Sequence, residues 1–222
     1  RYTIEGNPNL KNATVHNVDV KWEYYPTSGE VISISAFYKK FINPIESKAV
    51  VGTSGSTFSF ANAYQSDVAG AEIELKKSFV NAKNYFIRHL GLMANASYIY
   101  SKVNLGKENV GQSDNRPLQG QSPYSINAGI FFEDKELGLQ ANLLYNVIGK
   151  RIAFVGTDDN PDIYEMSRHV LDFNIQYRFK KNVEISLAAN DLINQPILFL
   201  QDGNRDKKWN RKSDQVFQRY QP

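Results

Sequence analysis

The chain has 222 residues, of which 41% are hydrophobic and 13% aromatic, and its 26 Lys and Arg against 23 Asp and Glu give a formal net charge of +3. So small a positive charge does not favour a nucleic-acid-binding protein, and we expect no nucleic acid among the partners. The sequence contains no cysteine, which excludes disulfide bonds, thiolate metal sites and cysteine nucleophiles. Its apolar runs are far shorter than the ~20 residues of a membrane-spanning helix, so a helical membrane protein is excluded as well.

Eight segments alternate between apolar and polar residues, which is the pattern of β-strands with one apolar face. In the fourth segment, for example, Leu92 and Ala94 alternate with Met93 and Asn95. In chain order the segments cover residues 17–24, 32–39, 71–76, 90–101, 124–133, 139–148, 171–179 and 183–190. No segment shows a convincing helical pattern, so the sequence predicts an all-β fold.

The connections between these segments alternate between short and long. Tight turns are expected at residues 26–29, 81–84, 134–138 and 180–182, and long loops of about twenty residues at 42–65, 103–122, 151–168 and 201–222. In an up-and-down sheet every second connection lies at the same end, so we expect the long loops at one rim and the tight turns at the other. This is the plan of an outer-membrane β-barrel.

The two faces of the predicted strands fit that plan. Several strands reach about ten residues, the length that a tilted membrane strand requires, and tyrosines gather at their ends as in an aromatic girdle, although tyrosine is also an ordinary strand former in soluble sheets. The residues predicted to face lipid are Leu92, Ala94, Ile126, Ala128, Leu143, Phe173, Ile175 and Leu187. Those predicted to line the lumen are Asp19, Lys21, Glu72, Glu74, Lys76, Asn142, Asp172, Asn174, Gln176 and Glu184.

A series of short phrases in this sequence resembles the second half of TonB-dependent outer-membrane receptors. They are GNPNLK at residues 6–11, ISAFYKK at 34–40 with NPIE at 43–46, PLQGQSPY at 117–124 with INAG at 126–129, LYNVIGKRI at 144–152, YEM at 164–166, RH at 168–169, LD at 171–172 and AANDLIN at 188–194. The likeness extends from about residue 6 to residue 222, and its specificity comes from the order and spacing of the phrases together.

The resemblance implies an antiparallel up-and-down transmembrane β-barrel segment, about eight strands of a barrel of about 22. Residues 1–222 would form one such segment, without the plug domain, the TonB-binding box or the closing strand of the family. The implied function is a part in the TonB-dependent, energy-coupled uptake of a scarce nutrient across the outer membrane of a Gram-negative bacterium. The implied partners are the plug domain and remaining barrel strands, TonB through the missing N-terminal part, membrane lipid and lipopolysaccharide, and a small solute.

Eight strands are numerically enough for a small closed barrel, but we expect this segment not to close on itself. Both ends resemble interrupted loops, with about twenty residues after Leu200 and at least eleven before the first strand that no strand is predicted to use. The strands 18–24 and 183–189 are therefore expected to pair with strands outside the segment, since unpaired backbone groups are costly in lipid and invite aggregation in water.

No catalytic, cofactor or metal-binding residue is predicted, and the protein is not expected to be an enzyme. His16, His89 and His169 lack a second ligand at metal-binding spacing. The oxygen-rich stretches 158–162 and 202–206 are better explained as turns than as calcium sites. The triplet 113–115 and the glycine loop 52–56 lack the partner motifs of a β-lactamase and a P-loop. The sequence assigns no substrate-binding residue.

The last loop is rich in basic and aromatic side chains. These are Arg205, Lys207, Lys208, Arg211, Lys212 and Arg219 beside Trp209, Phe217 and Tyr220. Such a group can bind phosphates of lipopolysaccharide or an anionic solute, but a solvated loop balanced by Asp202, Asp206 and Asp214 is the preferred interpretation.

Two other classes of function are open at this point. A soluble or surface β-sandwich that binds glycans through aromatic loops would show the same alternation. An outer-membrane hydrolase on a small barrel would need a serine and a histidine that converge at one rim.

Overall fold

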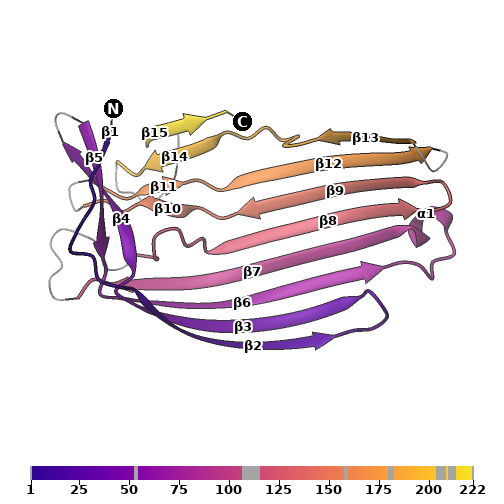
Figure 1. The fold of residues 1–222 in the computed structure, drawn as a ribbon, viewed down its shortest axis with the longest axis horizontal. Helices are drawn as coiled ribbons and strands as arrows, with labels where there is room; N and C mark the ends of the chain where they lie inside the picture. The colour runs from indigo at the N-terminus through magenta and orange to yellow at the C-terminus, as the bar shows by residue number, and fades with distance from the viewer. Residues whose placement is uncertain are drawn as a thin grey trace.

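The computed structural model describes residues 2–52, 55–106, 116–157, 160–179, 183–203, 209 and 214–221. Its largest element is an antiparallel sheet in which the eight predicted strands are all present and most of them longer than predicted (Figure 1). They are β2 (Thr14–Tyr24), β3 (Val31–Ile42), β6 (Gln65–Ser78), β7 (Leu90–Asn104), β8 (Tyr124–Asp134), β9 (Leu139–Ile148), β12 (Arg168–Phe179) and β13 (Val183–Ala189). The sheet order, β2-β3-β6-β7-β8-β9-β12-β13, follows the chain, which confirms the up-and-down meander.

The strand register separates the side chains into two faces. Ile34 of β3 pairs with Ile73 of β6, which pairs with Ala96 of β7, and this apolar row continues through Ile126 to Val147. All eight residues predicted to face lipid share this face, and those predicted to line the lumen share the other. The sequence alternation therefore gave the correct facing of every strand.

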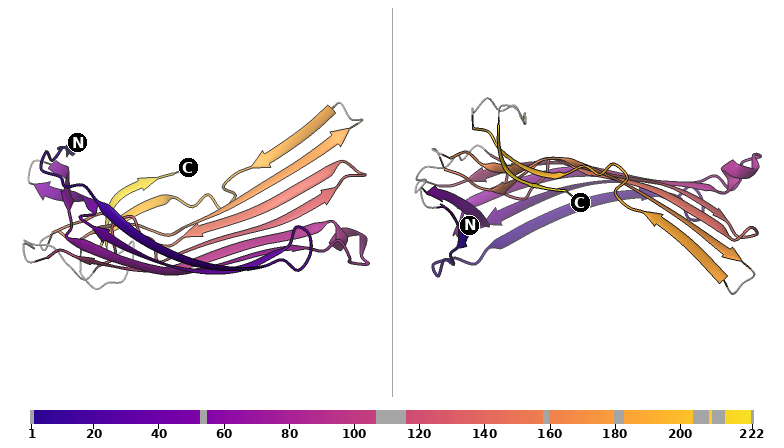
Figure 2. Two further views of the ribbon diagram at one scale, coloured as in Figure 1. Left: turned by 60° about the horizontal axis from the view of Figure 1, so that its bottom comes forward. Right: turned by 90° about the horizontal axis from the view of Figure 1, so that it is seen from above.

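The polar face is the hollowed side of the sheet. Figure 2 shows the sheet curved into an open trough. A hollow of about 330 Å³ on the polar face is lined by residues that include Lys21, Glu72 and Ser125. The apolar face remains exposed, with Trp22 of β2 56% and Leu187 of β13 64% accessible, and the described residues supply no second sheet to cover it. This arrangement argues against a soluble β-sandwich, whose apolar faces pack on each other.

The two edge strands of the sheet are β2 and β13, and they do not pair with each other. Every described residue of β2 is exposed, as expected for an edge without a neighbour. The prediction that this segment does not close an eight-stranded barrel is confirmed. That both edges pair with strands outside the segment stays a prediction.

The long connections lie at one rim and the short turns at the other, as predicted (Figure 1). The expectation that these connections and both chain ends lack strands is wrong, because the structure folds them into two small sheets. One has the order β1-β5-β4, with β1 (Tyr2–Ile4), β5 (Gly55–Asn62) and β4 (Ile45–Gly52). The other has the order β10-β11-β14-β15, with β10 (Arg151–Phe154), β11 (Ile163–Glu165), β14 (Ile197–Gln201) and β15 (Gln215–Tyr220).

One of the tight turns also differs from expectation. Between β6 and β7 the chain forms a single helical turn, α1 (Tyr85–Arg88), where only a loop was predicted. The Asn84 side chain begins it by accepting hydrogen bonds from the backbone N–H groups of Phe86 and Ile87. Among the described residues no helix is long and apolar enough to cross a membrane.

The assignment of faces can be tested with one substitution on each. Ile175 lies on the apolar face between Ala141 and Leu187, and its neighbour Asn174 lies on the polar face. An arginine at the lipid midplane of such a barrel costs about 2–4 kcal/mol. We expect Ile175→Arg to reduce insertion of the full receptor into lipid vesicles strongly and Asn174→Arg to leave it nearly unchanged. Equal insertion of the two variants would contradict the assignment.

Candidate ligand pocket at the long-loop end

The two small sheets lie at the long-loop rim, where they touch each other and together form an extension beyond the end of the main sheet (Figure 1). The backbone N–H of Val155 donates to the carbonyl of Ser47 at 3.1 Å, and Lys48 and Val155 form a parallel bridge between β4 and the end of β10. Residues from sequence positions about one hundred apart are thereby held side by side.

A buried ion pair fastens the 103–122 connection to this extension. Arg116 donates two hydrogen bonds to the Glu46 carboxylate, at 2.8 and 2.7 Å, and both side chains are almost inaccessible to solvent, at 3% and 4%. Burial disfavours the charge of Arg116, but the hydrogen bond and the charge of Glu46 outweigh it, so the pKa of Arg116 is raised. The backbone N–H of Gln119 also donates to Glu46, at 3.1 Å.

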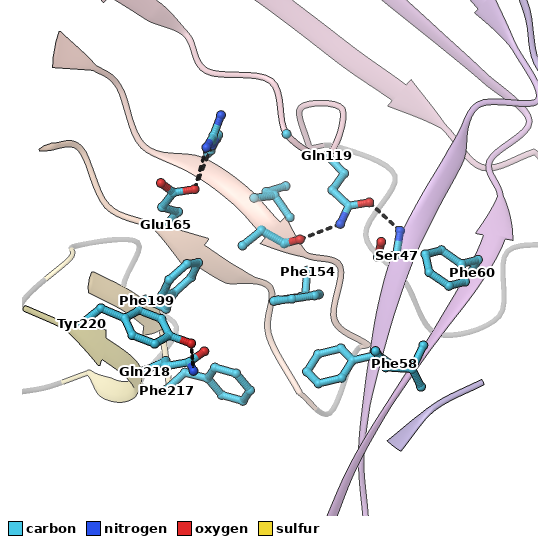
Figure 3. Close-up of a pocket in the computed structure, with 15 residues that line it drawn as sticks. Ser47, Phe58, Phe60, Gln119, Phe154, Glu165, Phe199, Phe217, Gln218 and Tyr220 are labelled. Carbon is cyan, nitrogen blue, oxygen red and sulfur yellow. Dashed lines mark hydrogen bonds and ion pairs between the residues drawn. The ribbon is translucent and has the colours of Figure 1, made fainter. Parts of the chain in front are cut away.

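Gln119 links the two small sheets through its side-chain amide. Its Oε1 accepts from the backbone N–H of Ser47 in β4, and its Nε2 donates to the carbonyl of Ala153 in β10 at 2.6 Å (Figure 3). This amide therefore joins β4 to β10 beside a cavity that Gln119 also lines, and the Arg116–Glu46 pair holds the segment that carries Gln119 against β4.

The cavity has a volume of about 850 Å³ and lies between the two small sheets. Nine of its lining side chains are aromatic or aliphatic, and they come from five different strands: Ile4, Phe58, Phe60, Ile152, Ala153, Phe154, Phe199, Phe217 and Tyr220 (Figure 3). The Phe58 and Phe154 rings lie 4.5 Å apart between centroids, and the Phe58 and Phe217 rings meet edge-on at 6.4 Å. This size and this apolar lining are typical of small-molecule sites.

The polar groups of the cavity are few. Arg151 and Glu165, which face each other across β10 and β11, form an ion pair of 2.8 Å at one side. The polar lining also includes Ser47 and the amide side chains of Gln119 and Gln218. Because the charged pair is internally neutral, the cavity suits an uncharged aromatic or apolar part of a ligand, with hydrogen bonds at its margin.

A second cluster lies on the same extension. The Nζ of Lys150 lies 4.5 Å from the centroid of the Trp209 ring and 5.6 Å from that of Tyr164, and the two rings are 4.4 Å apart. Burial raises the pKa of Tyr164 to about 12, and burial lowers the pKa of Lys150 against the opposing charge of Asp202. This cation–π contact ties the last long loop to β11.

The described part of the oxygen-rich stretch 158–162 makes side-chain hydrogen bonds of the kind found in turns. Residues 158 and 159 lie outside the described residues; beyond them, the Asp162 side chain accepts from the backbone N–H of Gly156 at 2.8 Å, and the backbone N–H of Asn160 donates to Thr157 Oγ1 at 3.3 Å. Burial raises the pKa of Asp162. No group of His, Asp and Glu that could hold a metal ion occurs in the part of the chain that the structure describes.

The three histidines lie on separate elements, and the hydrogen-bond partners of two of their side chains are not serines. His169 Nδ1 lies 2.6 Å from the Tyr145 hydroxyl, His89 Nδ1 lies 2.8 Å from the Tyr85 carbonyl, and His16 is exposed on β2. The described residues therefore give no support to a serine hydrolase.

The basic terminal loop is only partly visible. Residues 205, 207, 208, 211 and 212, together with 113–115 and 53–54, lie outside the described residues. Of the aromatic residues, Trp209 contacts Lys150, whereas Phe217 and Tyr220 line the cavity. The sequence analysis missed Phe58, Phe154 and Phe199, whose only sequence signal is the occurrence of aromatic residues inside long connections.

Comparison with known proteins gives a consistent family. The sequence model described as "TonB dependent receptor-like, beta-barrel" matches residues 1–192. The chain is 25% identical over 210 residues to an iron-regulated outer membrane virulence protein of Vibrio cholerae, covering 90% of this chain and 30% of that protein.

Several solved structures are similar in fold. They include the copper transporter OprC (TM-score 0.61, 17% identity, 86% of this chain and 27% of that one). The ferric enterobactin receptor PfeA of Pseudomonas aeruginosa in complex with BCV-L6 gives a TM-score of 0.57 at 18% identity, covering 87% of this chain and 28% of that one. The FrpB iron transporter of Neisseria meningitidis gives 0.56 at 11% identity, covering 98% and 30%. The chain spans 27–30% of the length of these relatives.

The buried Arg116–Glu46 ion pair predicts that a single substitution strongly destabilises the long-loop end of the structure. Glu46→Gln leaves the Arg116 charge buried without its counter-charge, which costs about 3–5 kcal/mol in comparable pairs. We expect faster hydrogen exchange in peptides covering 45–52 and 116–123 of the full receptor. The control is Glu184→Gln in the exposed Arg178–Glu184 pair at the other rim, whose loss should have little effect. Equal protection in wild type and Glu46→Gln would show that the pair does not hold the connection.

The raised pKa of Asp162 predicts that the local stability around this residue depends on pH. Since its pKa is raised in the folded protein, the neutral acid is the form that folding favours, and this stabilisation is present below the ordinary pKa and is lost as the pH rises through the folded value. Asp162→Asn imitates the neutral acid. We expect it to slow hydrogen exchange of residues 151–165 relative to wild type at pH 7, with the difference vanishing below about pH 4. Slower exchange that persists unchanged into acid would contradict this explanation.

Proposed function

This chain belongs to the TonB-dependent receptor-like β-barrel family and forms part of an outer-membrane protein of a Gram-negative bacterium, and we propose that the complete protein imports a scarce nutrient by TonB-dependent, energy-coupled transport. The observation that carries the proposal is the aromatic cavity of about 850 Å³ at the long-loop rim. In outer-membrane barrels the long loops are extracellular, so the cavity lies where a solute arrives.

The nutrient that we propose is a metal chelate, with iron the leading metal. The supporting facts are the names of the relatives, an iron-regulated outer membrane protein, a ferric enterobactin receptor, an iron transporter and a copper transporter. The cavity fits the organic part of such a chelate, since apolar and aromatic side chains form most of its wall and the Arg151–Glu165 pair and two glutamines supply hydrogen bonds.

The proposed partners follow from the two edges and the polar face. The remaining strands of the barrel pair with β2 and β13, where the backbone groups need partners. A plug domain, supplied by another part of the protein, contacts the polar face, on which Asn95, Asn127 and Asn146 form a hydrogen-bonded ladder. TonB engages the protein outside this segment. None of these residues makes or breaks covalent bonds in the proposed function.

Transport by the complete receptor tests the proposal. Cells that carry the receptor and are starved of iron should accumulate labelled iron from one member of a panel of ferric chelates, and deletion of TonB should abolish the accumulation. Uptake of no member of the panel, or uptake that is independent of TonB, would refute it.

The cavity predicts which side chains matter for capture. Phe199→Ala removes an aromatic wall of the cavity, and a loss of about 1.4 kcal/mol of apolar contact corresponds to a tenfold weaker binding of the transported chelate. The control is Phe86→Ala, which removes an equally large ring, 68% exposed, from α1 at the opposite rim. Chelate binding to whole cells, normalised to the amount of receptor in the membrane, is the measurement. Equal binding of the two variants would exclude the cavity as the site of capture.

A further inference from the structure

A row of polar and charged residues crosses the otherwise apolar face of the main sheet near its long-loop end. His16 of β2 pairs with Lys40 of β3, Lys40 pairs with Asp67 of β6, and Asp67 pairs with Lys102 of β7. Because paired residues point to the same side of a sheet, all four belong to the face that the Ile34–Ile73–Ala96 row identifies as apolar. Charged side chains on the lipid-facing side of a barrel are destabilising, so their presence on this face needs a physical explanation.

The row lies just beyond a group of exposed tyrosines. The neighbouring row of the same face contains Tyr38 and Tyr100, which are 45% and 62% exposed, and the next contains Tyr98, which is 68% exposed. Tyrosine rings gather at the level of lipid headgroups. The charged row, one step nearer to the long loops, therefore lies at the headgroup level of the outer leaflet.

Asp67 attracts Lys40 electrostatically and offsets part of the positive charge of the row. The Nζ atoms of Lys40 and Lys102 make no hydrogen bond or ion pair within the described residues, whereas Asp67 accepts hydrogen bonds from the Tyr38 hydroxyl at 2.5 Å and from Gln65 at 2.9 Å. Two lysines against one aspartate leave the row with a net charge of +1. Lys40 and Lys102 are two strands apart, about 10 Å at the backbone, so their long side chains can reach a common anion.

We propose that His16, Lys40 and Lys102 form a binding site for the phosphate groups of lipopolysaccharide on the outer surface of the barrel. Phosphate is the anion that lysine clusters at this level recognise, and a lipid-facing site excludes the imported solute as its ligand. Lipopolysaccharide is the phosphorylated lipid of the outer leaflet, toward which the long-loop rim points. The site rests on the outer-membrane location and is independent of which solute the receptor imports.

The test compares two double variants with the same charge change. Lys40→Gln with Lys102→Gln removes both cations from the lipid face, and Lys39→Gln with Lys76→Gln removes two cations from the polar face of β3 and β6. The full receptor is purified in detergent, and lipopolysaccharide bound to it is quantified by native mass spectrometry. We expect at least a fivefold loss of bound lipopolysaccharide for the first variant and no change for the second.

Two further ligands separate the possible sources of phosphate. Lipopolysaccharide stripped of its lipid A phosphates should bind the wild type as weakly as intact lipopolysaccharide binds the Lys40→Gln, Lys102→Gln variant, and phosphatidylglycerol micelles should not displace intact lipopolysaccharide. Equal loss in both double variants, undiminished binding of the stripped form, or full displacement by phosphatidylglycerol would each overturn the proposal.

Folding and transport are controlled separately. If the double variant does not assemble, the single variant Lys102→Gln, which changes an exposed side chain, takes its place. This variant should bind at least twofold less lipopolysaccharide than the wild type. Loss of bound lipopolysaccharide with normal uptake of the chelate would support the lipid site without affecting the proposed transport. Loss of uptake with unchanged lipid binding would refute the lipid site alone.

Discussion

Backbone N–H and C=O groups that cross a hydrocarbon layer find no water to pair with, so each of them needs a partner within the protein. In this chain the eight-stranded sheet supplies these partners by strand pairing from β2 to β13, and each of these two outer strands has a neighbouring strand on one side only. The same register decides which side chains meet lipid and which meet the lumen, because a slip of one residue in the pairing of a strand would move all of its side chains to the opposite face. The need to pair backbone groups therefore explains both why the sheet requires further strands and why its two faces differ.

The polar face shows how closely the side chains follow that register. Asn95, Asn127 and Asn146 are paired across β7, β8 and β9 and form side-chain hydrogen bonds in the same order. Phe37 lies over Gly70, its partner in β6, where an added Cβ would be 2.5 Å from the ring. Glycine is thus required at this position to receive the ring.

The sequence predicts the main sheet well and the loop-end pocket poorly, for a physical reason. Strands such as β7 and β8 carry their information locally, since alternation of side chains along a single strand is enough to identify it. The strands β10, β11 and β14 have three to five residues each, and two of their pairings contain register shifts, so alternation has no length over which to appear. The cavity depends on pairings of distant segments, such as β1 with β5 in parallel, which one sequence does not encode in a local pattern.

The buried Arg116–Glu46 pair explains how such short strands hold an open apolar cavity. Collapse of a cavity lined by Phe58, Phe154 and Phe199 would lower the free energy of the protein, because closer contact of the rings removes apolar surface from water. Apolar contacts are not directional and cannot by themselves keep two small sheets apart. A bidentate ion pair and an amide with bonds to both sheets are directional, and their desolvation cost is offset only in one geometry. The main role of the Arg116–Glu46 pair and the Gln119 amide is therefore to keep the cavity walls apart, and their contribution to the stability of the fold is secondary. This role explains why they lie beside the cavity and not in the main sheet.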